Sequence, residues 1–309
     1  MYTPNPQFVG VDTFTFRASD GPSQSALATV TINVTPRTVT TVHLDPNSDT
    51  GVSNTDRITN DNHPIFVGTT APNLRVVLYA QIAGATTPSI VGVSTADSGG
   101  NYTIGSIPLA DGTYEFFVEA FRADGLSTGR IDAGPLTIDT VAPVVTNVEL
   151  NPRTGQIYVT FKDDRVGLAN STATNIQNYS FTAKTLPHPL ADAITSATLL
   201  PGVSPTSPET IVLTSAGGRH TKHGRYLFRI ISGGVADIAG NALDGEFIGT
   251  FPSGNKVPGG DFYGEFLNGG NTRRNPIAFP DFIPVVTAGS ATPSGPVPHA
   301  RARHHRKGH

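Results

Sequence analysis

Short stretches in which apolar and polar residues strictly alternate recur along most of the chain. Residues 13–17 read Thr-Phe-Thr-Phe-Arg, and residues 28–34 read Ala-Thr-Val-Thr-Ile-Asn-Val. Successive side chains of a strand point to opposite faces, so a period of two residues predicts β-strands with one apolar face. The turn formers Ser, Asp, Gly and Pro at 19–22 lie between the two stretches. We therefore expect these stretches to form a β-hairpin.

The same alternation continues through two longer blocks. In residues 37–141, strand-like runs recur at intervals of about ten residues, which is typical of a β-sandwich. These runs cover 64–68, 74–80, 90–95, 101–104, 113–121 and 136–138. In residues 142–252 the corresponding runs cover 144–150, 155–161, 179–183, 193–200, 210–214 and 226–231. Residues 175–179 are predicted to begin as a short helical turn within this second block, because polar residues with capping chemistry precede them.

Composition supports an all-β fold. The 309 residues include 33 Gly and 25 Pro but only 15% charged side chains, as expected for many short strands joined by turns. The chain has no Cys, which excludes disulfides, thiolate zinc sites and cysteine nucleophiles. No apolar run approaches the roughly 20 residues that a membrane-spanning helix needs. Pro, Gly and Asn dominate residues 253–309, which we expect to be a linker and a disordered tail, with the aromatic stretch 259–263 as a candidate for packing back.

Residues 1–36 contain only the two strands of the first hairpin. Two strands do not normally form a stable sheet by themselves, so we expect earlier strands of this module to lie upstream of Met1. The sequence Tyr-Thr-Pro-Asn-Pro-Gln-Phe-Val-Gly-Val-Asp-Thr-Phe-Thr-Phe at 2–16, followed by Ser-Asp-Gly at 19–21, resembles the closing strands of cadherin-like repeats in large bacterial surface proteins. The resemblance implies that 1–36 is a truncated cadherin-like module.

Two further resemblances cover the predicted sandwiches. Four motifs in 37–141 resemble the bacterial immunoglobulin-like (Ig-like) repeats of adhesins: Ser-Asp-Thr-Gly-Val-Ser-Asn-Thr-Asp at 48–56, Ile-Thr-Asn-Asp at 58–61, Pro-Leu-Ala-Asp-Gly-Thr-Tyr at 108–114 and Ile-Asp-Thr-Val-Ala-Pro at 138–143. Gly-Val-Ala-Asp-Ile-Ala-Gly-Asn-Ala-Leu-Asp-Gly at 234–245 resembles the closing loop of S-layer-type Ig-like domains. The implied fold is a tandem of Ig-like β-sandwiches, bacterial Ig-like over 37–141 and S-layer-type over 142–252.

These resemblances imply a non-enzymatic function. We expect the C-terminal part of a large, exported, modular protein of the bacterial cell surface, in which the sandwiches act as structural or adhesive spacers. Its partners would be the neighbouring modules of the same chain and cell-wall or surface glycans, with no specific nucleic acid and no membrane span. The alternatives are a carbohydrate- or protein-binding module and an accessory region of a secreted enzyme. Aromatic side chains aligned on one sheet face would favour sugar binding, and the candidates are Tyr79, Tyr102, Tyr114 and Phe117.

Asp and Asn residues near the domain ends suggest structural calcium. Calcium takes six to eight oxygen ligands from carboxylates, amides and backbone carbonyls. We expect the first junction to use Asp45, Asp49, Asp56, Asn60 and Asp61, and the second to use Asp139, with Asp163 and Asp164 nearby. Asp and Asn are also common turn residues that bond their own backbone, which is the alternative explanation.

Other chemical groups give weaker signals. His220 and His223 have helical zinc spacing, but the glycines around them favour a hairpin loop. The four basic residues at 301, 303, 306 and 307 could contact a polyanion. The sequence contains no nucleophile elbow, no His-Glu-x-x-His motif and no phosphate-binding loop, so we expect no enzymatic activity.

Overall fold

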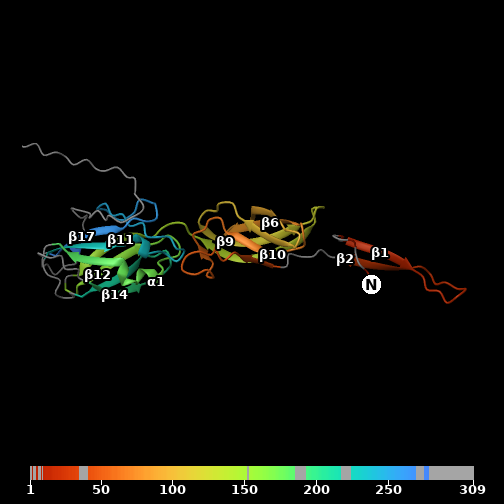
Figure 1. Ribbon diagram of the computed structural model, residues 1–309, viewed down its shortest axis with the longest axis horizontal. Helices are drawn as coiled ribbons and strands as arrows, with labels where there is room; N and C mark the ends of the chain where they lie inside the picture. Colours follow the sequence, from red (N-terminus) through yellow and green to blue (C-terminus); the bar gives the residue numbers. More distant parts are fainter. Residues whose placement is uncertain are drawn as a thin grey trace, which may run out of the picture.

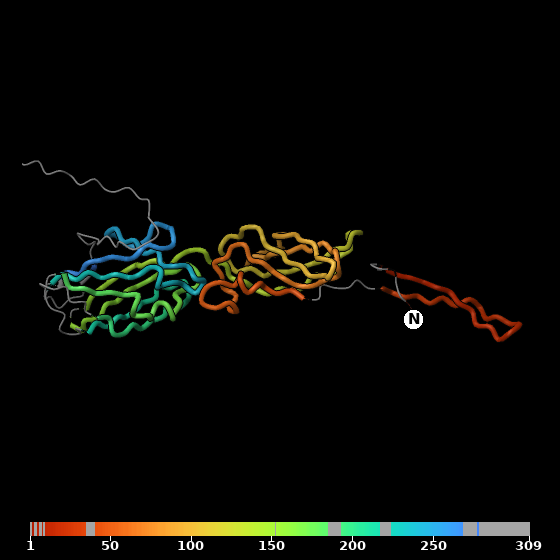
Figure 2. The backbone as a smooth tube through the Cα atoms, viewed as in Figure 1, coloured from red at the N-terminus to blue at the C-terminus, as the bar shows by residue number. Residues whose placement is uncertain are grey.

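The computed structural model describes residues 10–34, 41–151, 153–184, 193–216, 224–268 and 275–277, together with Tyr2, Asn5 and Phe8. The described residues form three β units that follow one another along the long axis of the molecule (Figure 1, Figure 2). This confirms the all-β fold class that the alternation predicted.

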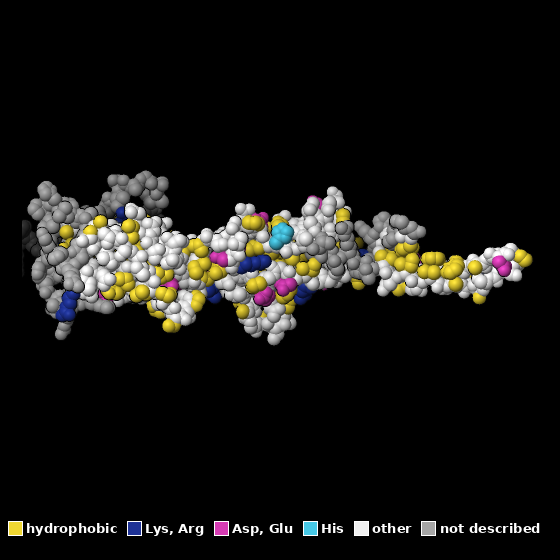
Figure 3. Space-filling model, turned by 90° about the horizontal axis from the view of Figure 1, so that it is seen from below, with side chains coloured by type: hydrophobic (Ala, Val, Ile, Leu, Met, Phe, Trp, Pro, Cys, Tyr) yellow, Lys and Arg dark blue, Asp and Glu magenta, His cyan; other side chains and the backbone are white. Residues whose placement is uncertain are grey.

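The first unit is the predicted hairpin. Its strands β1 (Gly10–Phe16) and β2 (Ala28–Val34) pair antiparallel, with Phe14 opposite Val30. One face carries Phe14, Phe16 and the apolar residues of β2, while the other face carries mainly Thr side chains, with Val11 opposite Asn33. Phe14 and Phe16 are 49% and 51% exposed, and apolar side chains line this end of the molecule in Figure 3.

The second unit is a sandwich of two sheets. One sheet has the order β4-β10-β9-β6-β7 and the other has the order β3-β5-β8. The strands are β3 (Thr41–Leu44), β4 (Ile58–Thr59), β5 (Ile65–Thr69), β6 (Arg75–Ile82), β7 (Ser89–Thr95), β8 (Asn101–Gly105), β9 (Gly112–Phe121) and β10 (Ser127–Ile138). Alternate residues of β9 point into the core, where the rings of Phe116 and Phe66 lie 4.7 Å apart. Burying such a side chain stabilises the fold by about 1.5–3 kcal/mol.

The third unit is a larger sandwich, with sheets ordered β14-β15-β12-β11-β18 and β13-β16-β17. Its strands are β11 (Val144–Asn151), β12 (Gln156–Lys162), β13 (Tyr179–Ala183), β14 (Ile194–Leu200), β15 (Glu209–Ser215), β16 (Gly224–Ile230), β17 (Phe262–Asn268) and β18 (Asn275–Pro276). One-turn helices α1 (Asn170–Ala173) and η1 (Ile176–Asn178) precede β13, and η3 (Ser232–Gly234) follows β16. The Asn175 side chain accepts a bond from the Gln177 backbone N–H, so the predicted helical turn forms with its cap.

The third sandwich continues past Pro252, where we expected it to end. Strand β17 pairs along its whole length with β16, and the side chains of Phe262 and Phe266 are fully buried. Ile277 also joins this core. The density of Gly, Pro and Asn before Phe262 suggested a linker, but these residues form the turns that carry the chain to its last strands. The predicted packing of the aromatic stretch 259–263 is correct.

The Asp/Asn-rich loop at 45–62 lies at the opposite end of the second sandwich from the one we expected. The loop after β3 lies where β10 ends and the third sandwich begins. There β4 runs parallel to β10, with Ile58 opposite Thr137. The backbone N–H of Val52 donates to the carbonyl of Ile238, 3.2 Å away in the third sandwich. This loop therefore belongs to the second junction.

Candidate metal centre

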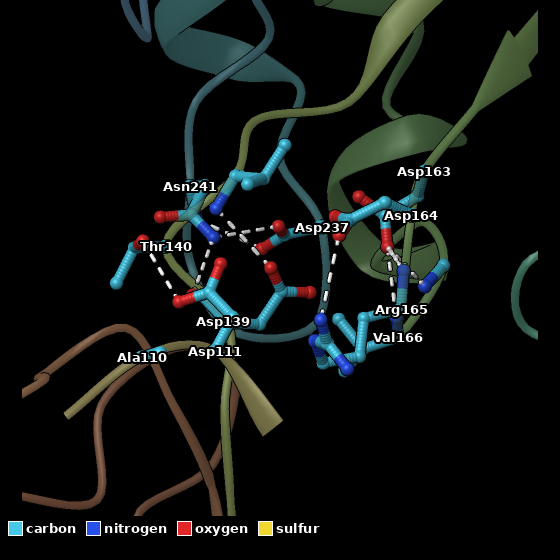
Figure 4. Close-up of polar contacts among 12 residues, drawn as sticks. Ala110, Asp111, Asp139, Thr140, Asp163, Asp164, Arg165, Val166, Asp237 and Asn241 are labelled. Carbon is cyan, nitrogen blue, oxygen red and sulfur yellow. Dashed lines mark hydrogen bonds and ion pairs between the residues drawn. The ribbon is translucent and has the colours of Figure 1, made fainter.

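Five carboxylates converge where the second and third sandwiches meet (Figure 4). Asp139 directly follows β10, and Asp111 directly precedes β9, so both come from the second sandwich or its exit. Asp163 and Asp164 follow β12, and Asp237 lies in the loop after η3, so these three belong to the third sandwich. The strand ends thus deliver the side chains to one place.

The carboxylates form two groups of three that share Asp139. One group is Asp139, Asp163 and Asp237, and all three side chains are buried. The other is Asp111, Asp139 and Asp164, in which Asp164 is exposed. Within each group, one ligand oxygen per residue lies within 4.8 Å of the others. Oxygens that bind one calcium ion at 2.3–2.6 Å lie at such separations.

Backbone hydrogen bonds hold the buried group in place. One oxygen of Asp163, Oδ2, accepts from the backbone N–H groups of Val166 and Gly167, each at 2.8 Å. Asp237 accepts from the backbone and from the side chain of Asn241, both at 2.8 Å. The same Asn241 Nδ2 donates to the backbone carbonyl of Asp139 at 2.8 Å, across the junction. The tight loop around Asp237 therefore fixes both its carboxylate and the exit of β10.

Two oxygens of the buried group have no hydrogen-bond partner. They are Oδ2 of Asp139 and Oδ1 of Asp163, and neither is accessible to solvent. Asp139 is fully buried and Asp163 is 3% exposed. A buried charged oxygen without a partner carries the whole cost of its desolvation, so it is normally paired or bound to a metal. The hard oxygen donors, without His or Cys, fit calcium or magnesium better than zinc.

Three carboxyl groups of the cluster have raised pKa values because they are buried beside other negative charges. Burial, and next the charge of Asp163, raises the pKa of Asp139 to about 7. Burial raises the pKa of Asp237 to about 6, although hydrogen bonds from Asn241 act in the opposite direction. Burial and the charge of Asp163 also raise the pKa of Asp164.

The metal-free protein should be more stable at pH 5 than at pH 8. An ordinary Asp has a pKa of about 3.9, so the folded protein holds protons on Asp139 and Asp237 that the unfolded chain releases. This stabilisation is present at low pH and is lost as pH rises through about 6 to 7. We expect the unfolding midpoint in chelator to fall by several degrees from pH 5 to pH 8, and Asp139→Asn to reduce the fall. A midpoint in the wild type that is unchanged, or higher at pH 8, would contradict this.

Of the five predicted Asp ligands, only Asp139 belongs to a group of three carboxylates in the part of the chain that the structure describes. Asp45, Asp56 and Asp61 each accept a hydrogen bond from the backbone two residues on, as turn residues do. Oδ2 of Asp49 accepts from the Arg57 backbone, and Asn60 Oδ1 accepts from a Thr50 hydroxyl. The turn explanation therefore describes Asp45, Asp56 and Asp61. Asp49 and Asn60 bond residues eight and ten positions away, and Oδ1 of Asp49 is buried without a hydrogen-bond partner, so the turn explanation does not cover these two. Asp163 and Asp164 do meet Asp139.

Asp111 and Asp237 are the cluster members that the sequence analysis did not select. Both lie in motifs quoted for the family resemblance, Asp111 at 108–114 and Asp237 at 234–245. The signal that could have identified Asp237 is the spacing Asp-x-x-Gly-Asn, because Gly240 has a φ of +96° and closes a loop in which Asn241 bonds Asp237. Other predicted groups, His220, His223 and the basic tail, lie outside the described residues.

The four aromatic candidates for sugar stacking do not form one platform. Tyr102 and Tyr114 are buried, and their hydroxyls donate to the carbonyls of Thr41 and Ala110. Tyr79 and Phe117 pair on the outer face of the sheet, but the guanidinium of Arg130 lies over the Tyr79 ring at 4.2 Å. The Arg130 guanidinium thus already covers the face of the Tyr79 ring on which a sugar would stack.

Among the described residues, no helix is long and apolar enough to cross a membrane. Residues 31–140 match the family model of the bacterial Ig-like domain, and residues 1–33 match that of the bacterial Ig domain. No curated protein matches the chain. Among solved structures, a marsupial T cell receptor is similar at 11% identity and a TM-score of 0.20, over 56% of this chain and 87% of that one. Residues 1–140 are therefore similar to bacterial Ig-like domains, a class that is typically non-catalytic and common in surface proteins.

Proposed function

We propose that the two sandwiches form a stiff, calcium-braced spacer of a bacterial surface protein. The observation that carries this proposal is the buried carboxylate group at the junction, with its two unpartnered oxygens on Asp139 and Asp163. A spacer needs a junction that resists bending, and the proposed partners of this region are therefore the neighbouring modules of its own chain. Domain interfaces without such a brace normally permit relative motion.

Direct contacts support stiffness at the same junction. The loop at Gly51 packs against the loop at Ile238, Ala239 and Gly240, and the Val52 N–H donates to Ile238. Gly51 has a φ of +90°, which favours glycine. A Cβ on Gly51 would also meet backbone atoms of the third sandwich, among them the Ala239 carbonyl carbon at 2.7 Å. The backbones of the two loops lie so close together here that only glycine fits at position 51.

Calcium suits the carboxylates that are present. Asp139, Asp163 and Asp237 would hold the ion, and it would supply the positive charge that the two unpartnered oxygens lack. Because Asp139 directly follows the last strand of the second sandwich while the other two lie in the third, the ion would fix the exit of β10 onto the third sandwich. Neutral oxygen ligands would complete the coordination shell.

The distance between spin labels on the two sandwiches tests this function. The chain has no Cys, so labels at Thr103→Cys and Ser196→Cys, both at exposed strand positions, would be unique. We expect double electron–electron resonance spectroscopy to give a narrow distribution of label-to-label distances in calcium and a clearly broader one in chelator. Distributions of equal width, with no calcium binding by calorimetry, would overturn the proposal.

Gly51→Ala should loosen the junction in the labelled protein. The added methyl group cannot fit against Ile238 and Ala239, so we expect a broader distance distribution even in calcium. Thermal unfolding of the variant should show that each sandwich is still folded. The matched control is Gly233→Ala, because a Cβ at Gly233 meets nothing within 4 Å and its φ is ordinary. If both variants keep the narrow distribution, the glycine contact does not hold the sandwiches together.

A further inference from the structure

We infer that two copies of this chain associate through the outer face of the sheet β4-β10-β9-β6-β7 in the second sandwich. This inference goes beyond the proposed spacer function and does not depend on calcium. It starts from apolar side chains that point away from the core on three neighbouring strands. These are Val77 and Tyr79 of β6, Phe117 of β9, and Ile90 and Val93 of β7, and we call them the outer apolar patch.

The outer apolar patch is unusual for a sheet face that meets solvent. In the register of β6 and β7, Ile90 lies beside Tyr79. Val93 lies beside Val77 in the same way, and Ile90 and Val93 are each 55% exposed. Val77 is fully buried although it is not part of the core of the sandwich, so its neighbours on the outer face cover it. The exposed face of an antiparallel sheet normally carries polar side chains, and a contiguous apolar patch on it marks an interaction site.

Arg130 of β10 gives this face an ordered polar group. Its guanidinium carbon lies 4.2 Å from the centroid of the Tyr79 ring and 5.8 Å from that of the Phe117 ring. One of its nitrogens lies 3.5 Å from a carboxylate oxygen of Glu119, yet the Arg130 side chain is still 40% exposed. Aromatic residues and Arg are enriched at the centre of protein interfaces, and side chains that are already held in place lose less entropy on binding. The face therefore fits a protein partner.

The charges at the two ends of the face indicate that this partner is a second copy of the chain. Arg75 is exposed at one end, where it pairs with Phe121, and Glu115 is exposed at the other end, where it pairs with Gln81. Asp132 of β10 is exposed in the acidic half. From residue 115 to residue 121, β9 rises by about 20 Å, so the two ends are too far apart to pair within one chain. Among the described residues, neither Arg75 nor Glu115 forms an ion pair.

A twofold axis that lies between two facing sheets and runs across their strands satisfies these charges. It brings Arg75 of each copy close to Glu115 of the other, and it places the two outer apolar patches on each other. The strands of the second sandwich run along the long axis of the molecule, so this axis makes the two chains antiparallel (Figure 1). An antiparallel pair suits chains that project from two facing surfaces.

The contact area sets the strength of this association. Four strands at a spacing of about 4.8 Å and a length of about 20 Å present a face of roughly several hundred Å². Such a face lies at the small end of specific protein interfaces. We therefore expect a reversible dimer with a dissociation constant of about 10–100 μM.

Sedimentation velocity of the full chain at concentrations from about 1 to about 500 μM tests the inference. We expect the wild type to pass from monomer to dimer over this range, in chelator as well as in calcium. Val93→Lys places a charge in the outer apolar patch and should weaken the association at least about tenfold. The matched control is Val203→Lys, because the Val203 side chain is fully exposed in the third sandwich and its variant should associate like the wild type. Thermal unfolding checks that both variants are folded.

Charge reversal tests the twofold arrangement. Arg75→Glu and Glu115→Arg each bring like charges together in the dimer, so each should weaken the association about tenfold. The double variant restores both pairs with exchanged signs, and its dissociation constant should return to within about threefold of the wild-type value. Because the two residues lie at opposite ends of the face, such a recovery requires contact between two copies.

Three results would overturn the inference. The first is a wild type that stays monomeric over the whole concentration range. The second is a dimer that Val93→Lys leaves unchanged, since it would form through another surface such as the exposed face of the hairpin. The third is a double variant as weak as the single variants, which contradicts the twofold arrangement. None of these results bears on the calcium-braced junction, which is tested separately by the spin-label distances.

Discussion

Replacing Phe262 by Ala is expected to destabilise the third sandwich by about 3–5 kcal/mol, the usual effect of truncating a buried aromatic side chain. Phe262 is fully buried on β17, and its ring contacts those of Phe228, Phe247 and Phe251. The truncation would leave a cavity among three aromatic rings that belong to other segments of the sandwich. A stability of 5–15 kcal/mol is typical of a domain, so the loss is a large share of the total.

Urea unfolding measures this loss of stability when it is followed by circular dichroism, because that signal reports the β-structure of the sandwiches directly. The matched control is Leu267→Ala on the same strand, where the side chain is 63% exposed and its removal should change stability by less than about 1 kcal/mol. Equal, small effects of the two substitutions would show that β17 is not part of the third core. The experiment therefore also tests whether the sandwich extends beyond Pro252.

The alternation of apolar and polar residues predicted most strands, because successive side chains of a strand point to opposite faces of the sheet. In β9, Tyr114, Phe116 and Val118 point into the core while Glu115 and Glu119 point out, so the sequence itself records the two faces. The end of the third sandwich was harder to predict, because the pattern is interrupted by the turns between residues 252 and 261. Pairing of β17 with β16 is a long-range contact, and no local pattern announces it.

The candidate site was predicted only in part, for a related reason. Asp139, Asp163 and Asp164 follow strands, so their position at a domain end could be predicted from the strand pattern. Asp45, Asp56 and Asp61 also lie in a stretch rich in Asp and Asn, but each accepts a hydrogen bond from the backbone of its own turn. What distinguishes a ligand from a turn residue is whether its oxygens already have partners, and that depends on the fold of loops such as the one that holds Asp237.

Asp139→Asn is expected to have opposite effects with and without calcium. In chelator at pH 8 the variant should be more stable than the wild type, because it removes a buried charge that has only like charges beside it. In saturating calcium the wild type should be the more stable protein, since a ligand at 100 times its dissociation constant adds about 2.7 kcal/mol that the variant loses. A residue that served only to pack the junction would shift stability in the same direction under both conditions.

Urea unfolding of both proteins in calcium and in chelator gives the four free energies that this comparison needs. Asp132→Asn serves as the control, since an exposed carboxylate outside the two groups should respond to neither condition. A reversal of the order of stability between wild type and Asp139→Asn identifies the Asp139 carboxylate as a calcium ligand. If Asp139→Asn is less stable than the wild type by the same amount in both solutions, Asp139 supports the junction without metal, and its unpartnered oxygen has another cause.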